Sequence, residues 1–135
     1  MKKSALIGYR LGKPEDIPFI FSSWLKGIRF GNDAFRKVPS KYYYKVMHAR
    51  LDSILQTPGC VVTVACLKTD PDTVLGYSVS NHNTLHWVFV KKGWRGIGIG
   101  RDLTPITTTK ITMTTRPIEA LLKSYPLIEV EVIKL

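Results

Sequence analysis

The sequence has few cysteines and lacks any recognisable metal-binding cluster. Cys60 and Cys66 are the only cysteines among 135 residues, too few for a disulfide scaffold. They lie six positions apart in one predicted strand, roughly 20 Å at ~3.3 Å per residue, which is too far for a disulfide between them. No Cys-x-x-Cys motif or Cys/His cluster occurs, so we expect no metal site and a reduced, cytoplasmic protein.

Long apolar runs are also missing. The residues before Gly8 include too few apolar side chains for the core of a signal peptide, which needs about 7–15. The longest nearly apolar run, Cys60 to Leu67, is far short of the ~20 residues of a membrane-spanning helix. We therefore expect no membrane partner.

Acidic residues are scarce relative to basic ones. Twenty Lys and Arg stand against ten Asp and Glu, which gives a net charge of +10. This excess indicates an anionic partner: nucleic acid, a phosphorylated metabolite or a membrane surface. The chain is 44% hydrophobic and 22% charged, values typical of a globular protein, and its length predicts one domain over residues 1–135.

Hydrophobic periodicity predicts a fold that mixes helices and strands. Apolar spacing in steps of three and four indicates helices over 17–28 and 40–55, separated by a loop over 29–38. Alternation with period two indicates three consecutive strands that follow the second helix. The predicted order is β-α-α-β-β-β-α-β-α-β, with strands at 5–11, 60–67, 73–80, 84–90, 110–115 and 127–135 and short helices after Gly100 and at 117–124. Pro105 limits the first of these short helices.

The glycine-rich segment 93–100 is the most informative part of the chain. It follows the hydrophobic strand 84–90 and precedes a helix, and such glycines let backbone N–H groups converge on an anion. The Walker A pattern is absent, and Arg101 stands where a dinucleotide fingerprint needs its third glycine. The segment therefore indicates a phosphate or pyrophosphate site, with a β-to-α turn that binds nothing as the alternative.

Two motifs make the chain resemble the GNAT superfamily of acyl-CoA-dependent N-acetyltransferases. Arg95-x-x-Gly98-x-Gly100 looks like the acyl-CoA-binding motif of that family, and Tyr9-Arg10-x-x-x-Pro14-Glu-Asp-Ile-Pro18 is similar to its first strand and helix start. The resemblance covers nearly the whole chain. It implies an α+β (mixed α/β) fold with a central, mostly antiparallel sheet flanked by helices. Trp24-Leu-Lys and the tyrosine-rich second helix are also similar to short GNAT-like proteins of bacteriophages.

The resemblance implies transfer of an acetyl or other acyl group from acyl-CoA to an amine acceptor by direct attack. His86 resembles a family base, and its ordinary pKa of ~6.5 suits proton acceptance at neutral pH. Tyr125 resembles the family acid that protonates the thiolate. By alternation, His86 would share a strand face with Val88 and Val90. The implied acyl-CoA-binding residues are Val88, Phe89, Val90, Arg95, Gly96, Ile97, Gly98, Ile99, Gly100 and Arg101.

Two departures from the family pattern leave an alternative open. Pro105 shortens the helix after the glycine loop, and the sequence stops at Leu135, where the family usually adds a strand. A second subunit can cover such an incomplete edge, which predicts a homodimer. The alternative function is a basic protein that binds or modifies nucleic acid on a GNAT-like scaffold, with or without transferase activity.

Overall fold

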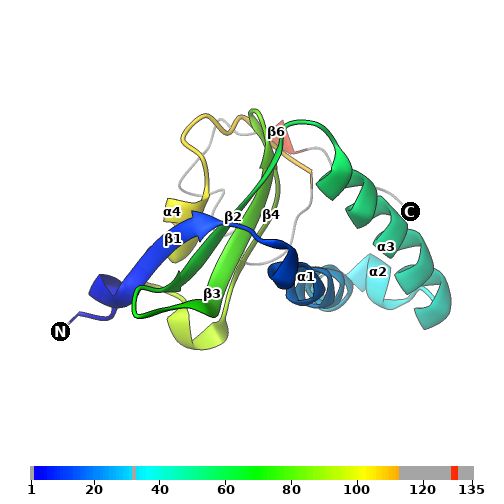
Figure 1. Ribbon diagram of the computed structural model, residues 1–135. Coiled ribbons are helices and arrows are strands. Elements are labelled where there is room, and N and C mark those ends of the chain that lie inside the picture. Colours follow the sequence, from blue (N-terminus) through cyan, green and yellow to red (C-terminus); the bar gives the residue numbers. More distant parts are fainter. Residues whose placement is uncertain (1, 32, 113–128, 131–135) are drawn as a thin grey trace.

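The computed structural model describes residues 2–31, 33–112 and 129–130. It is a mixed α/β structure with helices on both faces of one sheet (Figure 1). Three short 3-10 turns, η1, η2 and η3, cover Lys3–Leu6, Pro14–Asp16 and Lys92–Trp94. The helices are α1 Ile17–Gly31, α2 Asp33–Arg36, α3 Ser40–Gln56 and α4 Ile99–Leu103; the strands are β1 Ile7–Leu11, β2 Cys60–Leu67, β3 Asp70–Asn81, β4 Thr84–Val90, β5 Lys110–Ile111 and β6 Glu129–Val130.

The sheet has six strands in sequence order from β1 to β6. The first four strands pair antiparallel, whereas β4 pairs with β5, and β5 with β6, in parallel. A parallel pair requires a crossover connection, and the segment that contains α4 supplies it between β4 and β5. The candidate site lies along β4, beyond the residues that pair with β5.

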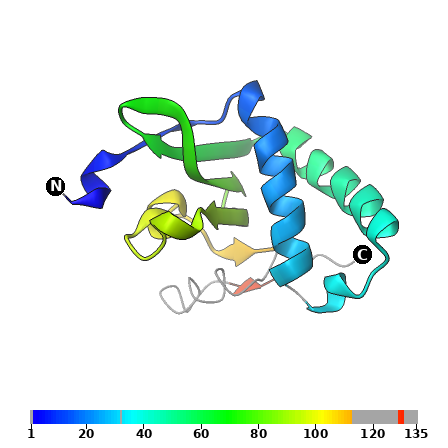
Figure 2. The same cartoon turned by 90° about the horizontal axis from the view of Figure 1, so that it is seen from below.

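Helices α1 and α3 cover one face of the sheet (Figure 2). The buried side of α1 carries Trp24, whose ring stacks on Trp87 of β4 with the centroids 6.2 Å apart. Phe19, at the start of α1, contacts Tyr77 and Phe89 edge-on. Aromatic contacts of this kind add to the stabilisation from apolar burial, so they fix α1 against the middle of β3 and β4.

Helix α4 packs on the opposite face. Ile99 and Leu103 are each 2% exposed, and the helix contacts β2, β3 and β4. Thr104 follows Leu103, and Pro105 cannot donate a helical hydrogen bond. The predicted truncation by Pro105 is confirmed, because α4 has only five residues.

The first strand is tied to the first helix by a bidentate ion pair. Arg10 of β1 donates to both carboxylate oxygens of Asp16, at 2.8 and 3.0 Å, and the Lys13 amide donates to the same carboxylate at 2.8 Å. These donors lower the pKa of Asp16 below its ordinary value, chiefly through the hydrogen bonds from Arg10. The motif that begins at Tyr9 thus has a structural role.

Several predicted boundaries were wrong. The first strand starts at Ile7 because Lys3–Leu6 forms a 3-10 turn, and β3 starts at Asp70 because irregular pairing with β2 draws the turn residues into the ladder. The segment 29–38 is no simple loop: α1 runs to Gly31, and α2 follows. Arg29 ties the C-terminal end of α1 to the segment before α3, because its guanidinium donates to the Val38 carbonyl at 3.1 Å.

Helix α3 is joined to α1 by a buried tyrosine. Tyr43 of α3 is fully buried, and its hydroxyl donates to the Leu25 carbonyl of α1. The predicted helix at 117–124 and most of the strand at 127–135 lie outside the described residues. Within the part of the chain that the structure describes, no helix is both long and apolar enough to cross a membrane.

Candidate active site

The loop after β4 contains two glycines in the left-handed conformation. Gly96 has a φ of +81° and Gly98 a φ of +94°, values that residues with a side chain rarely adopt. A Cβ at Gly96 would meet nothing within 4 Å, so backbone conformation, and not crowding, requires glycine there. The predicted glycine turn is therefore present, and Gly98 leads directly into α4.

A groove of about 200 Å³ runs along β4 beside the end of α1. It is lined by four consecutive strand residues, Trp87 to Val90, and by Arg95 from the loop. Successive strand side chains point to opposite faces, so a groove that contacts all four must follow the edge of the strand. It brings together Val88, Phe89, Val90 and Arg95, four of the residues predicted to bind acyl-CoA.

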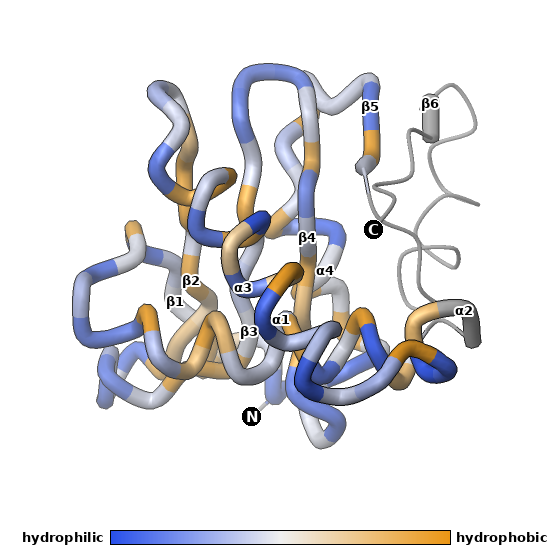
Figure 3. The backbone as a smooth tube through the Cα atoms, turned by 90° about the vertical axis from the view of Figure 1, so that its right-hand side faces the viewer, coloured by the Kyte–Doolittle hydropathy of each residue, from blue (hydrophilic) through white to orange (hydrophobic). Residues whose placement is uncertain are grey.

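Among residues 2–31, 33–112 and 129–130, this edge of β4 is open beyond its first part, because β5 pairs only with Thr84 and Leu85. Parallel pairing joins Thr84 to Lys110 and Leu85 to Ile111, and the Thr112 amide then donates to the Leu85 carbonyl at 3.3 Å. Figure 3 shows β5 beside the start of β4 alone. Among the described residues, no strand pairs with β4 from His86 to Val90 on this side.

Arg95 is held at the end of the groove near the glycine loop. Its Nε donates to the Val90 carbonyl at 2.9 Å, and the residue as a whole is exposed. This contact directs the guanidinium over the last strand residue of the groove. A cation in this position can neutralise phosphate that lies against the glycine loop.

The remaining predicted binding residues differ in what their side chains do. Ile99 is 2% exposed and belongs to the core, so only its backbone can bind a ligand. Arg101 is exposed, and its guanidinium lies beside Gly98, where an added Cβ would stand 3.3 Å from Nη2. Ile97 packs partly against the core, and Gly100 lies near Val90.

A β-bulge lies at His86. Leu85 pairs with Ser80 and Trp87 with Val79, so His86 is an extra residue in β4. The alternation that predicted a common face for His86, Val88 and Val90 is therefore interrupted. Bulges re-aim side chains and are common beside active sites.

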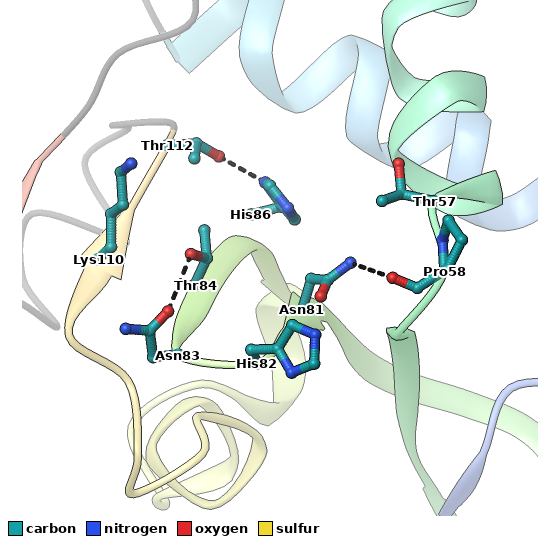
Figure 4. Close-up of a pocket in the computed structure, with 9 residues that line it drawn as sticks. All are labelled: Thr57, Pro58, Asn81, His82, Asn83, Thr84, His86, Lys110 and Thr112. Atoms are coloured by element: carbon teal, nitrogen blue, oxygen red, sulfur yellow. Dashed lines mark hydrogen bonds between the residues drawn. The ribbon is translucent and has the colours of Figure 1, made fainter.

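His86 lines a polar hollow of about 470 Å³ at the start of the open edge (Figure 4). Its Nδ1 is 2.8 Å from the Thr112 hydroxyl oxygen, whereas Nε2 makes no hydrogen bond with the described residues. Burial, with a smaller effect of the Lys110 charge, lowers the pKa of His86 below its ordinary value. The lowered pKa favours the neutral imidazole. The other lining residues are Thr57, Pro58, Asn81, His82, Asn83, Thr84, Lys110 and Thr112.

Tyr125 lies outside the described residues, so its position relative to His86 stays a prediction. Sequence reasoning missed Thr112, which was one of many threonines in its segment. It also missed Gly27, which lines the groove opposite Trp87. A glycine inside a helix costs ~1 kcal/mol relative to alanine, so the presence of Gly27 in a predicted helix was a sign that this position has a special role.

Comparison with known proteins identifies the fold. No family model matches the chain, and no curated protein matches its sequence. Solved structures do match: one, described as a putative acetyl transferase from Pyrococcus furiosus, has 20% identity, a TM-score of 0.54, and an alignment over 96% of this chain and 83% of that one. The chain has the GNAT fold.

Two further structures support this fold. A protein from Clostridium difficile 630, described as a possible acetyltransferase, has 16% identity and a TM-score of 0.51, over 96% of this chain and 80% of that one. The apo form of YjaB from Escherichia coli has 18% identity and a TM-score of 0.51, over 92% and 69% respectively. The likeness to these three structures, each 20% identical or less, concerns the fold.

Proposed function

We propose that this protein transfers an acyl group from acyl-CoA to an amine. One observation carries the proposal: the open edge of β4 connects the left-handed glycine loop at one end to His86 at the other. His86 and Val90 are four residues apart, about 13 Å at ~3.3 Å per residue. An extended pantetheine arm fits along an edge of this length.

The chain supplies three kinds of contact to such a substrate. Backbone groups of Val88 and Phe89 along the open edge can pair with the amides of the arm, as an added strand would. Backbone N–H groups from Gly96 to Arg101 can donate to the pyrophosphate, because left-handed glycines let them converge. Arg95 and the basic residues around the loop add charge of the opposite sign.

His86 is the proposed general base. Its lowered pKa keeps the ring neutral, and Thr112 holds Nδ1, which leaves Nε2 to accept a proton from the attacking amine. The amine nitrogen forms a bond to the acyl carbon, and the carbon–sulfur bond breaks. We propose Tyr125, from its resemblance to the family acid, as the donor of a proton to the leaving thiolate.

Calorimetric titration with acetyl-CoA tests the binding site. Gly98→Ala places a side chain at a φ of +94°, a strain of about 1–3 kcal/mol that the loop relieves by changing shape. We expect at least ~10-fold weaker binding than in the wild type. Gly93→Ala is the matched control in the same loop, since an added Cβ there meets nothing within 4 Å and φ is not positive.

Equal affinities in the wild type and both variants would exclude the glycine loop as the phosphate site. Circular dichroism of each variant checks that the fold persists. His86→Ala, which lies far from the loop in β4, is expected to bind acetyl-CoA normally and to lose turnover. A loss of binding in this variant would contradict its role as a base.

A further inference from the structure

The net charge of the protein is concentrated in one segment. Residues 17–51 contain seven Lys and Arg but a single acidic residue, so they supply +6 of the net +10. This segment is the part of the chain that forms α1, α2 and most of α3. The three helices form one layer on the same side of the sheet (Figures 1 and 2).

Five of the seven basic residues of segment 17–51 are exposed to solvent. We define the basic helical face as the exposed residues Lys26, Arg36, Lys37, Lys41 and Lys45. The two salt bridges among the described residues, Arg10–Asp16 and Lys13–Asp72, lie elsewhere. None of the four lysines of the face therefore has a carboxylate partner in the described part of the chain.

Two of these lysines are placed where they repel each other. Lys41 and Lys45 are four residues apart in α3, a spacing that brings side chains together on a helix and destabilises it when the charges are alike. Only Asp52 supplies an acidic group within α3, near the opposite end, and it accepts hydrogen bonds from Gln56. An anionic partner would remove this repulsion.

Exposed aromatic rings accompany the charges. Phe30 is 57% exposed and Tyr42 is 54% exposed. Phe30 is near the end of α1 and Tyr42 near the start of α3, and the two helices meet where the Arg29 guanidinium lies 5.1 Å from the centroid of the Tyr43 ring. Arg36 of α2 donates to the Phe30 carbonyl at 2.8 Å. Phe30 also lines the groove along β4, so this aromatic ring links the helical layer to the candidate active site.

We propose that the basic helical face binds single-stranded nucleic acid. Lysines would neutralise successive phosphates, and the rings of Phe30 and Tyr42 would stack on unpaired bases, the combination by which proteins bind single strands without sequence preference. A lipid surface fits less well, because the exposed positions of α3 are mainly polar or basic and offer no apolar stripe to insert. This binding goes beyond acyl transfer and does not depend on it.

Fluorescence anisotropy with a labelled 20-nucleotide strand of mixed sequence tests the proposal, measured as a function of salt. For single strands the slope of log K against log salt is about −0.7 per phosphate neutralised. Lys41→Gln/Lys45→Gln should therefore reduce the slope by about 1.4 and weaken binding at low salt. Lys2→Gln/Lys68→Gln removes the same charge from exposed positions elsewhere and should leave the slope nearly unchanged.

Two further measurements identify the kind of partner. Tyr42→Ala should weaken binding of the strand about fivefold or more, whereas Tyr42→Phe should not, because stacking needs the ring alone. Equal losses in the two double variants would overturn the proposal, since binding would then follow total charge. Tight binding to phosphatidylglycerol vesicles with none to the strand would also overturn it.

Titration with acetyl-CoA separates this proposal from the proposed function. The double variant Lys41→Gln/Lys45→Gln should bind acetyl-CoA as the wild type does, which also shows that it is folded. A protein that binds the strand but not acetyl-CoA would support the basic helical face and contradict acyl transfer. The reverse result would support acyl transfer and overturn the basic helical face.

Discussion

Gly27 lies in the middle of α1, directly against the ring of Trp87. A Cβ at this position would stand 2.6 Å from Cζ2 and 3.0 Å from Cη2 of the indole. Trp87 is 3% exposed, and its ring stacks on Trp24, so any movement of the indole disturbs this packing. In Gly27→Ala either the indole or the helix must therefore shift.

Two effects of opposite sign decide the stability of Gly27→Ala. Alanine is favoured over glycine inside a helix by about 0.8–1 kcal/mol. Overpacking of a buried site costs about 1–3 kcal/mol, and here the neighbour is a large, held ring. We expect a net loss of about 1 kcal/mol, which corresponds to a Tm lower by roughly 3–5 °C for a chain of this size.

Thermal unfolding followed by circular dichroism measures this loss, with Gly100→Ala as the control. Gly100 also lies in a helix against β4, but its added Cβ would stand 3.9 Å from Cγ2 of Val90, an ordinary contact. Gly100→Ala should therefore be as stable as the wild type or slightly more stable. If Gly27→Ala were equally stable, the close approach of α1 to β4 would be refuted. Gly27 and Trp87 line the groove, so Gly27→Ala should also bind acetyl-CoA less tightly.

Two further predictions concern titrating groups. The kcat/KM of acyl transfer should rise with pH through a midpoint below the ordinary histidine value of ~6.5, because burial and Lys110 lower the pKa of His86 and the neutral ring is the base. His86→Ala should lose about 10²–10⁴-fold in kcat/KM, and an unchanged pH profile in that variant would contradict the role. Asp16→Asn breaks the ion pair with Arg10 and should lower the free energy of unfolding, measured with urea at pH 7, by roughly 2 kcal/mol. This loss is smaller than the loss expected when a fully buried ion pair is broken. The folded pKa of Asp16 is lowered, so this stabilisation is present above the ordinary aspartate pKa and is lost as pH falls through the folded value. The two proteins should therefore approach equal stability in acid, and equal stability already at pH 7 would refute the contribution of the pair.

Local signals in the sequence predicted the architecture well. The strand limits of β2 and β4 are as expected, because apolar alternation and flanking turn residues act within a few positions. The glycine conformations at 96 and 98 also follow from a local pattern. The mixed fold with a mostly antiparallel sheet is confirmed.

Features that depend on distant contacts could not be predicted. The continuation of α1 to Gly31 depends on Arg29 and its contact with the Val38 carbonyl. The bulge at His86 arises from the pairing of β3 with β4, and the hydrogen bond to Thr112 from the pairing of β4 with β5. Neither pairing can be read from the residues around His86 themselves, so alternation alone could not reveal the bulge.

Amide hydrogen exchange with and without acetyl-CoA shows whether this substrate lies along the open edge of β4. We expect slower exchange in two segments, at Val88 to Val90 and at Gly96 to Arg101, when acetyl-CoA is added. Amides of β2, which lies two strands away, should exchange at the same rate with and without it. If acetyl-CoA binds and both segments stay unprotected, the substrate does not lie on this edge.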